Sequence, residues 1–291
     1  MEAYIFNLVN LIAIYAILAV TLNFIMGYAG IYSLAHAVFF GLGAYTSAWV
    51  AQNVHPSILL TIPAAMMAAA ALSLLLALPA LRVRGEYFVA ASLGLQVLAV
   101  TIFSEWKSFT GGIGGVLAIP PANVFGIEVF KPAHFAILSV VALVIVMALI
   151  NALVHSSFGR NLRAIHDSES AAASFGKNVP MIKTISVVIS AALAAVAGAL
   201  YASYLSFINV ESFTLDASVL VMAMVIIGGT GTVAGPIVGA ALLMLLPSLI
   251  SWFDFLPQTE IGALQQIIYG LGMTLLMIFR PGGIVGRRAK A

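Results

Sequence analysis

The sequence predicts an all-α membrane protein, a polytopic bundle of transmembrane helices. Of its 291 residues, 63% are hydrophobic and only 8% are charged, and a soluble domain this apolar would lack the polar surface needed to cover it. Apolar runs of about 20 residues, enough to cross a hydrocarbon core about 30 Å thick, recur along the whole chain. The basic residues also gather in alternate connections between these runs. We therefore expect a single transmembrane domain over residues 1–291.

Nine apolar runs are expected to form helices. They cover about 4–26, 34–51, 58–81, 87–104, 133–155, 184–208, 217–229, 233–251 and 262–280. The first run has no basic residue before it and no clear small-residue cleavage site, so we expect a retained span rather than a signal peptide. The run at 217–229 is short for a crossing at about 1.5 Å per residue. It ends in the glycine cluster GGTGTVAGP (228–236), and is either extended by its neighbours or one half of a broken helix.

The charge distribution predicts the orientation of the nine crossings. An odd number places the two ends on opposite sides, and the excess of Lys and Arg on the cytoplasmic side places the N-terminus outside and the C-terminus inside. The basic residues expected inside are Arg82, Arg84, Arg160, Arg163, Lys177, Lys183, Arg280, Arg287, Arg288 and Lys290. Only Lys107 and Lys131 are expected outside, together with Glu2, Glu105, Glu128, Glu211, Asp216, Asp254 and Glu260.

Two long connections remain between the runs. The outer one, about 105–132, is rich in Gly and Pro, whereas the inner one, about 156–183, contains a helical pattern. Residues 158–179 predict one amphipathic helix that ends at Gly176. Its mostly apolar face carries Phe158, Leu162, Ile165, Glu169 and Ala172. Such a helix either lies on lipid headgroups as a basic linker or docks into a groove on a partner, and composition alone favours the linker.

Glycines and uncharged polar residues within the runs mark a candidate translocation path. Gly41, Gly43, Gly198 and Gly239 are expected to permit close helix packing. Other glycines stand beside polar residues at the ends of runs, where irregular backbone needs cover from protein or water. One such stretch, IMGYAG (25–30), faintly resembles IIGGTG (226–231), as in a parallel repeat. The path candidates are Asn23, Gly27, Gly30, Ser33, His36, Gln96, Gly228, Gly229 and Gly231, although a lone histidine is more often structural.

Several kinds of chemistry have no support in the sequence. There is no G-x-x-x-x-G-K-[ST] phosphate loop, no histidine pair at i, i+4 and no cysteine. No charged residue lies near the centre of a predicted span, so the buried carboxylates of an ion-coupled carrier are not expected. We therefore expect a membrane protein that is not an enzyme, with no cofactor of its own and no nucleic-acid partner, and any energy for its action must come from elsewhere.

Six stretches together carry a resemblance to a known family. They are GYAGIYSLAHAVFFGLGAYTSA (27–48), LRVRGEYFVAASLG (81–94), FTGGIGGVLAIP (109–120), FGRNLRAIHDSESAAASFG (158–176), ISAALAAVAGALYA (189–202) and GGTGTVAGPIVGAAL (228–242). In this order they resemble the permeases of branched-chain amino acid (LIV-type) ABC importers, and most closely the paired permease that carries the FGR-x-LRAI inner loop. SAAASFG (170–176) resembles the E-A-A-x-x-x-G coupling loop of such importers. Members of this family often have an acidic residue near the position of Gln96. The neutral amide of Gln96 departs from that pattern.

The resemblance implies partners and a location. It implies a second LIV-type permease, two ATP-binding cassette subunits that bind the ATP, and an external or periplasmic substrate-binding protein, in the lipid bilayer of the bacterial inner membrane. The ATPases would contact Arg160, Arg163, Glu169, Ala172 and Gly176, and the external protein would meet Glu105, Lys107 and Lys131. The implied substrates are branched-chain or other hydrophobic amino acids. Urea or short-chain amides remain an alternative, as do a stand-alone channel or ion-coupled carrier and a structural scaffold.

Overall fold

The computed structural model describes residues 2–80, 86–124, 126–250, 261–279 and 282–285. The elements in chain order are α1 (Glu2–Ala29), α2 (His36–Asn53), α3 (Ile58–Ala80), α4 (Glu86–Glu105), α5 (Lys107–Thr110), the 3-10 turn η1 (Gly112–Gly114), β1 (Asn123–Val124), β2 (Ile127–Glu128), α6 (Pro132–His155), α7 (Ser157–Asp167), α8 (Glu169–Ser174), α9 (Val179–Leu205), the 3-10 turn η2 (Val210–Phe213), α10 (Leu215–Gly228), α11 (Gly235–Ile250) and α12 (Ile261–Phe279). Each of the nine predicted apolar runs coincides with one of these helices. The two short strands pair antiparallel in the 105–132 connection.

Five of the described helices are long and apolar enough to cross a membrane. They are Tyr4–Ala29, Ile58–Leu75, Tyr87–Glu105, Pro132–His155 and Val179–Leu205. Shorter apolar helices lie at Leu215–Gly228 and Gly235–Pro247. The chain is therefore a helical membrane protein, as predicted from its composition. For the run at 217–229, the structure shows a separate helix of 14 residues, about 21 Å long at the usual rise.

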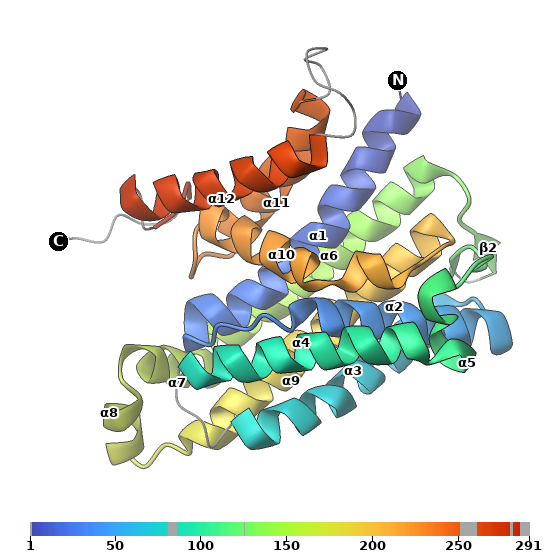
Figure 1. Ribbon diagram of the computed structural model, residues 1–291. Coiled ribbons are helices and arrows are strands. Elements are labelled where there is room, and N and C mark those ends of the chain that lie inside the picture. Colours follow the sequence, from blue (N-terminus) through green and yellow to red (C-terminus); the bar gives the residue numbers. More distant parts are fainter. Residues whose placement is uncertain (1, 81–85, 125, 251–260, 280–281, 286–291) are drawn as a thin grey trace.

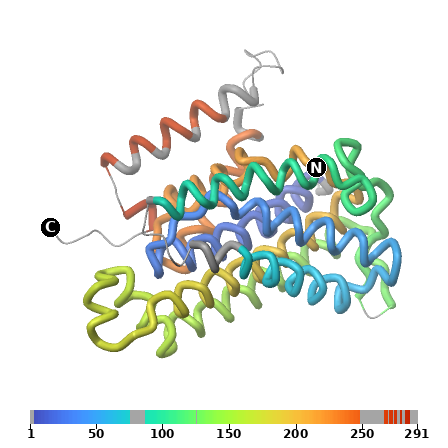
Figure 2. The backbone as a smooth tube through the Cα atoms, turned by 60° about the horizontal axis from the view of Figure 1, so that its bottom comes forward, coloured from blue at the N-terminus to red at the C-terminus, as the bar shows by residue number. Residues whose placement is uncertain are grey.

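The central helix of the bundle is α2, which lies along α9 (Figures 1 and 2). Small residues allow this contact. A Cβ atom on Gly43 would come within 2.6 Å of the Ala195 Cα, and one on Gly198 would come within 2.7 Å of the Ala44 amide nitrogen. The backbones of α2 and α9 are thus close enough that only glycine fits, which confirms the packing role predicted for these positions.

A non-helical segment between α1 and α2 brings the start of α2 into the interior of the bundle. After α1 ends, Gly30 adopts a left-handed φ of +67°, and residues 30–35 run back along α1 without helical structure. His36, the first residue of α2, then contacts Thr21, with 2.9 Å between His36 Nε2 and Thr21 Oγ1. Since Thr21 lies about two turns before the end of α1, α2 begins well inside the bundle.

Helix α12 lies at one side of the bundle. In Figure 1, α12 stands away from the other helices, and its described contacts are with α10 and α11. The end of α10 is tied to the segment 282–285, because Ile284 N–H donates to the Ile227 carbonyl and Val285 N–H to the Gly228 carbonyl, both at 3.0 Å. These bonds satisfy two of the carbonyls that a helix leaves unpaired at its C-terminal end.

The inner connection corrects one prediction. Instead of one helix ending at Gly176, it forms α7 and α8, separated by Ser168 in an extended conformation (φ −162°, ψ 112°). The Ser168 hydroxyl accepts a hydrogen bond from Ala171 N–H and so caps a new helix, which explains the break. Leu162, Ile165 and Ala172 are buried as predicted, but Glu169 is exposed and does not share their face.

Candidate translocation and coupling sites

Asn23 joins α1 to the turn between α10 and α11. Its Oδ1 accepts from Gly231 N–H at 2.9 Å, and its Nδ2 donates to the Thr232 carbonyl at 2.7 Å. One buried amide therefore satisfies both a donor and an acceptor of irregular backbone. Asn23 therefore has a structural role, holding α1 to this turn, and that role explains its presence without a contact to substrate.

Replacing Asn23 by alanine is expected to lower the free energy of unfolding by about 1–3 kcal/mol, because both backbone groups lose a partner where water is scarce. The measurement is the thermal midpoint of the purified protein in detergent. Asn53→Ala is the matched control, since the Asn53 amide is exposed and donates only to the Trp49 carbonyl. Equal midpoints for the two variants would contradict this structural role of Asn23.

Two of the predicted glycine stretches, IMGYAG and IIGGTG, meet at Gly27 and Gly231. A Cβ on Gly27 would overlap the Gly231 backbone, and one on Gly228 would overlap the Gly235 carbonyl. Gly27 and Gly228 are therefore close-packing positions, like Gly43. Gly231 has a positive φ of 72°, so the turn itself requires glycine there, as it does at Gly30 and Gly229.

Ser33 and His36 both serve the start of α2. The Ser33 hydroxyl accepts from Ala35 N–H at 3.3 Å, and His36 is 1% exposed with its Nε2 on Thr21. Thr21 in turn donates to the Leu18 carbonyl, while the His36 Nδ1 has no hydrogen-bond partner within the described chain. Both side chains are therefore buried, and that of His36 faces α1.

Gln96 connects three elements in the interior. Its Nε2 donates to the Phe213 carbonyl at 2.8 Å, and its Oε1 accepts from the Ser218 hydroxyl at 3.3 Å. Ser218 Oγ also accepts from Ala37 N–H at 2.9 Å, next to the start of α2. Gln96 therefore holds α4 against η2 and α10, and the sequence showed no signal for Ser218 as its partner.

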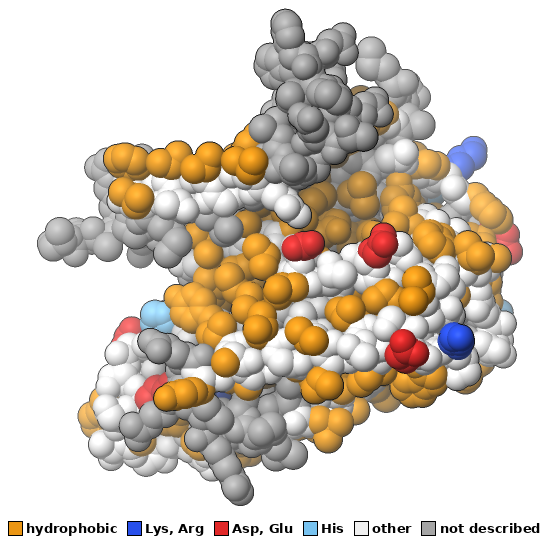
Figure 3. Space-filling model, in the orientation of Figure 1, with side chains coloured by type: hydrophobic (Ala, Val, Ile, Leu, Met, Phe, Trp, Pro, Cys, Tyr) orange, Lys and Arg blue, Asp and Glu red, His pale blue; other side chains and the backbone are white. Residues whose placement is uncertain are grey.

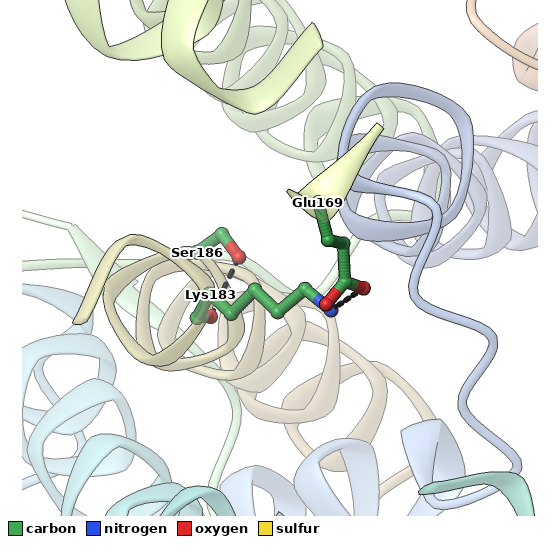
Figure 4. Close-up of polar contacts among 3 residues, drawn as sticks. All are labelled: Glu169, Lys183 and Ser186. Carbon is green, nitrogen blue, oxygen red and sulfur yellow. Dashed lines mark hydrogen bonds and ion pairs between the residues drawn. The ribbon is translucent and has the colours of Figure 1, made fainter. Parts of the chain in front are cut away.

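Contacts within the coupling segment hold α7 and α8 against the ends of longer helices. Arg163 Nη2 donates to the Val154 carbonyl at the end of α6, at 2.7 Å. Glu169 at the start of α8 forms an ion pair with Lys183 on α9, where Ser186 also donates to the Lys183 carbonyl at 2.7 Å (Figure 4). Two of the predicted coupling residues are thus engaged with this chain itself.

The remaining coupling candidates differ in exposure. Arg160 is exposed, Ala172 on α8 is buried, and Gly176 ends the segment with a φ of +74°. A further contact comes from His166, which no sequence pattern singles out and whose Cδ2 would lie 3.1 Å from a Cβ on Gly30. The ring of His166 therefore connects α7 to the break between α1 and α2. Among the residues described, no three His, Asp or Glu side chains come together as a metal site would require.

Comparison with known proteins identifies the family. Residues 4–279 match the family described as branched-chain amino acid transport system / permease component. The chain belongs to this permease family. It is 31% identical to the high-affinity branched-chain amino acid transport system permease protein LivM of Escherichia coli K12, over 96% of this chain and 69% of that protein. No solved structure matches the permease.

Two further relatives are similar over most of their length. The permease is 22% identical to the probable branched-chain amino acid transport permease protein LivM of Methanocaldococcus jannaschii, over 94% of this chain and 90% of that one. It is 25% identical to the permease protein LivH of Salmonella typhimurium, over 97% and 94% respectively. LivM and LivH are both permease components, so the chain resembles each of two related subunits.

Proposed function

We propose that the protein is a permease subunit of a bacterial ABC importer that carries branched-chain or other hydrophobic amino acids across the inner membrane. It works beside a second LIV-type permease, two ATP-binding cassette subunits and an external substrate-binding protein. Nine crossings, with the N-terminus outside and the C-terminus inside, place α7 and α8 on the cytoplasmic side. Membership of the family and the names of its relatives support this assignment.

The observation that carries the proposal is the placement of α7 and α8. These short helices contact the ends of α1, α6 and α9 through His166, Arg163 and the Glu169–Lys183 pair. A displacement of α7 and α8 by a partner outside the membrane would therefore be transmitted to the ends of three long helices. Such a segment suits a transporter driven by ATP hydrolysis on another subunit, and it has no use in a stand-alone channel.

The decisive experiment reconstitutes the chain in liposomes with its proposed partners. Uptake of leucine should require ATP, both ATPases and the external binding protein. Uptake by this chain alone that follows an ion gradient and ignores ATP would support the channel or carrier instead. Preferential uptake of urea or a short-chain amide would support the alternative substrate class.

The double variant Arg163→Ala with Glu169→Ala is expected to lower uptake at least about fivefold while ATP hydrolysis continues, which is the lower range of couplings between distant sites. Both changes release α7 and α8 from this chain. The ratio of transported leucine to hydrolysed ATP is the measurement. The charge-swapped pair Glu169→Lys with Lys183→Glu should restore much of what Glu169→Lys alone loses, and a wild-type ratio in the double alanine variant would contradict the coupling role.

A further inference from the structure

Helix α10 has only 14 residues and begins in the middle of the bundle. Gln96 lies at the centre of α4, 10 residues after Glu86 and 9 residues before Glu105, which places it about 14 to 15 Å from either end of a helix that is long enough to span the membrane. It bonds the Phe213 carbonyl and the Ser218 hydroxyl. Residues 213–218, and with them the start of α10, therefore lie level with the middle of α4. Because α4 is one of the proposed crossings, this level corresponds to mid-membrane depth.

Asp216 lies in this interval and its side chain is exposed. In the sequence Asp216 stands at the end of an apolar run, where an outer position is predicted, whereas the bonds of Gln96 place the start of α10 level with the middle of α4. The positive N-terminal end of α10 favours a carboxylate at that position. Neither ion pair of the described chain includes Asp216. An ionised carboxylate facing lipid tails is unfavourable, so it needs a water-lined path or a cation.

Exposed branched side chains occur one turn after Asp216 and on the helix that α10 contacts. Val219 follows at i+3 on the same side of α10 and is 38% exposed, and on α4 Val97, next to Gln96, is 58% exposed. Figure 3 shows acidic side chains among hydrophobic ones on the face that α4 and α10 present, below α12. A carboxylate beside exposed branched side chains matches a molecule with an ammonium group next to a branched apolar group.

We propose that Asp216 is a substrate site on the translocation path, where its carboxylate binds the α-ammonium group of the amino acid while the apolar side chain lies against Val219 and Val97. This inference rests on the proposed function and deepens it. The path then follows the α4–α10 face, and not the interior where Ser33 and His36 lie. Since urea and short-chain amides carry no ammonium group, the site also selects amino acids from the substrates considered above.

The test uses the reconstituted importer with the Asp216→Asn variant, which keeps the shape of the side chain and removes its charge. Leucine uptake should fall about tenfold or more, as expected for the loss of one charge-assisted interaction. Asp216→Glu should retain most of the uptake. Glu211→Gln is the matched control, because Glu211 is also an exposed carboxylate but lies on η2, where Asn209 Nδ2 is 3.5 Å from its Oε2.

Three results would overturn the proposal. The first is an uptake rate in Asp216→Asn like that of wild type. The second is loss of the second permease from purified Asp216→Asn, which would make Asp216 an ion-pair partner across the subunit interface. The third is an equal loss of uptake in Glu211→Gln. Failure of the proposed function would instead appear as absence of ATP-dependent uptake by the wild-type assembly.

A second measurement exploits the absence of cysteine from the chain. Asp216→Cys should react with a charged, membrane-impermeant thiol reagent, because a translocation path contains water. Val144→Cys is the control, since Val144 is 57% exposed at the centre of α6, 12 residues after Pro132 and 11 before His155. Reaction of Asp216→Cys no faster than Val144→Cys would mean that position 216 faces lipid, and the proposal would be wrong.

Discussion

Replacing Gly198 by alanine is expected to destabilise the protein by about 1–3 kcal/mol, the range of a clash in a well-packed interior. A Cβ at this position would overlap the Phe40 carbonyl and lie 2.7 Å from the Ala44 amide nitrogen. Neither neighbour is a flexible side chain, so α9 must move away from α2. Because this contact lies along the central helix, we expect lower yield and a lower thermal midpoint in detergent.

The control is Gly94→Ala on α4, where an added Cβ would meet nothing within 4 Å. Helix propensity alone favours alanine over glycine by about 1 kcal/mol at both positions. The two variants should therefore change the midpoint in opposite directions. A stabilised Gly198→Ala would show that α2 and α9 are further apart than the structure places them.

Replacing Gln96 by methionine, which has a similar shape but no amide, is expected to cost about 1–3 kcal/mol and to reduce uptake. The Phe213 carbonyl and the Ser218 hydroxyl would each lose a partner at a depth where water does not replace it. Since this amide holds the start of α10 against α4, its loss should also displace Asp216. The measurements are the thermal midpoint and ATP-dependent uptake in liposomes.

Gln52→Met is the matched control for this change. The Gln52 Nε2 makes a comparable bond of 2.8 Å to the Leu117 carbonyl, but the side chain is exposed and water can replace the bond. It should therefore change the midpoint little. If both methionine variants melt together, the buried amide contributes less than its position suggests.

The positions of the helices could be predicted from the sequence because burial in a membrane requires long apolar runs. Even α10 and α12, at 217–229 and 262–280, were predicted within a few residues. The packing glycines were also predicted, at Gly43 and Gly198, since small residues in apolar runs have few other uses.

The depth of each residue could not be predicted in the same way. The position of a residue within an apolar run does not give its distance from the membrane surface wherever a helix begins inside the bundle. His36 and Asp216 both follow such breaks. The capping serine at Ser168 was missed for a similar reason, because a periodic pattern can continue across a short extended residue. Partners distant in sequence, such as Gln96 and Ser218, leave no local signal.

The pairing of segment 282–285 with the end of α10 has a consequence for synthesis of the protein. The carbonyls of Ile227 and Gly228 meet their donors from Ile284 and Val285 only after more than fifty further residues have been translated. Until then, one end of α10 has to be sheltered by the insertion machinery or by lipid headgroups. A ribosome stalled before residue 284 should therefore hold a chain in which that end is open to proteases, and release of the full segment should close it.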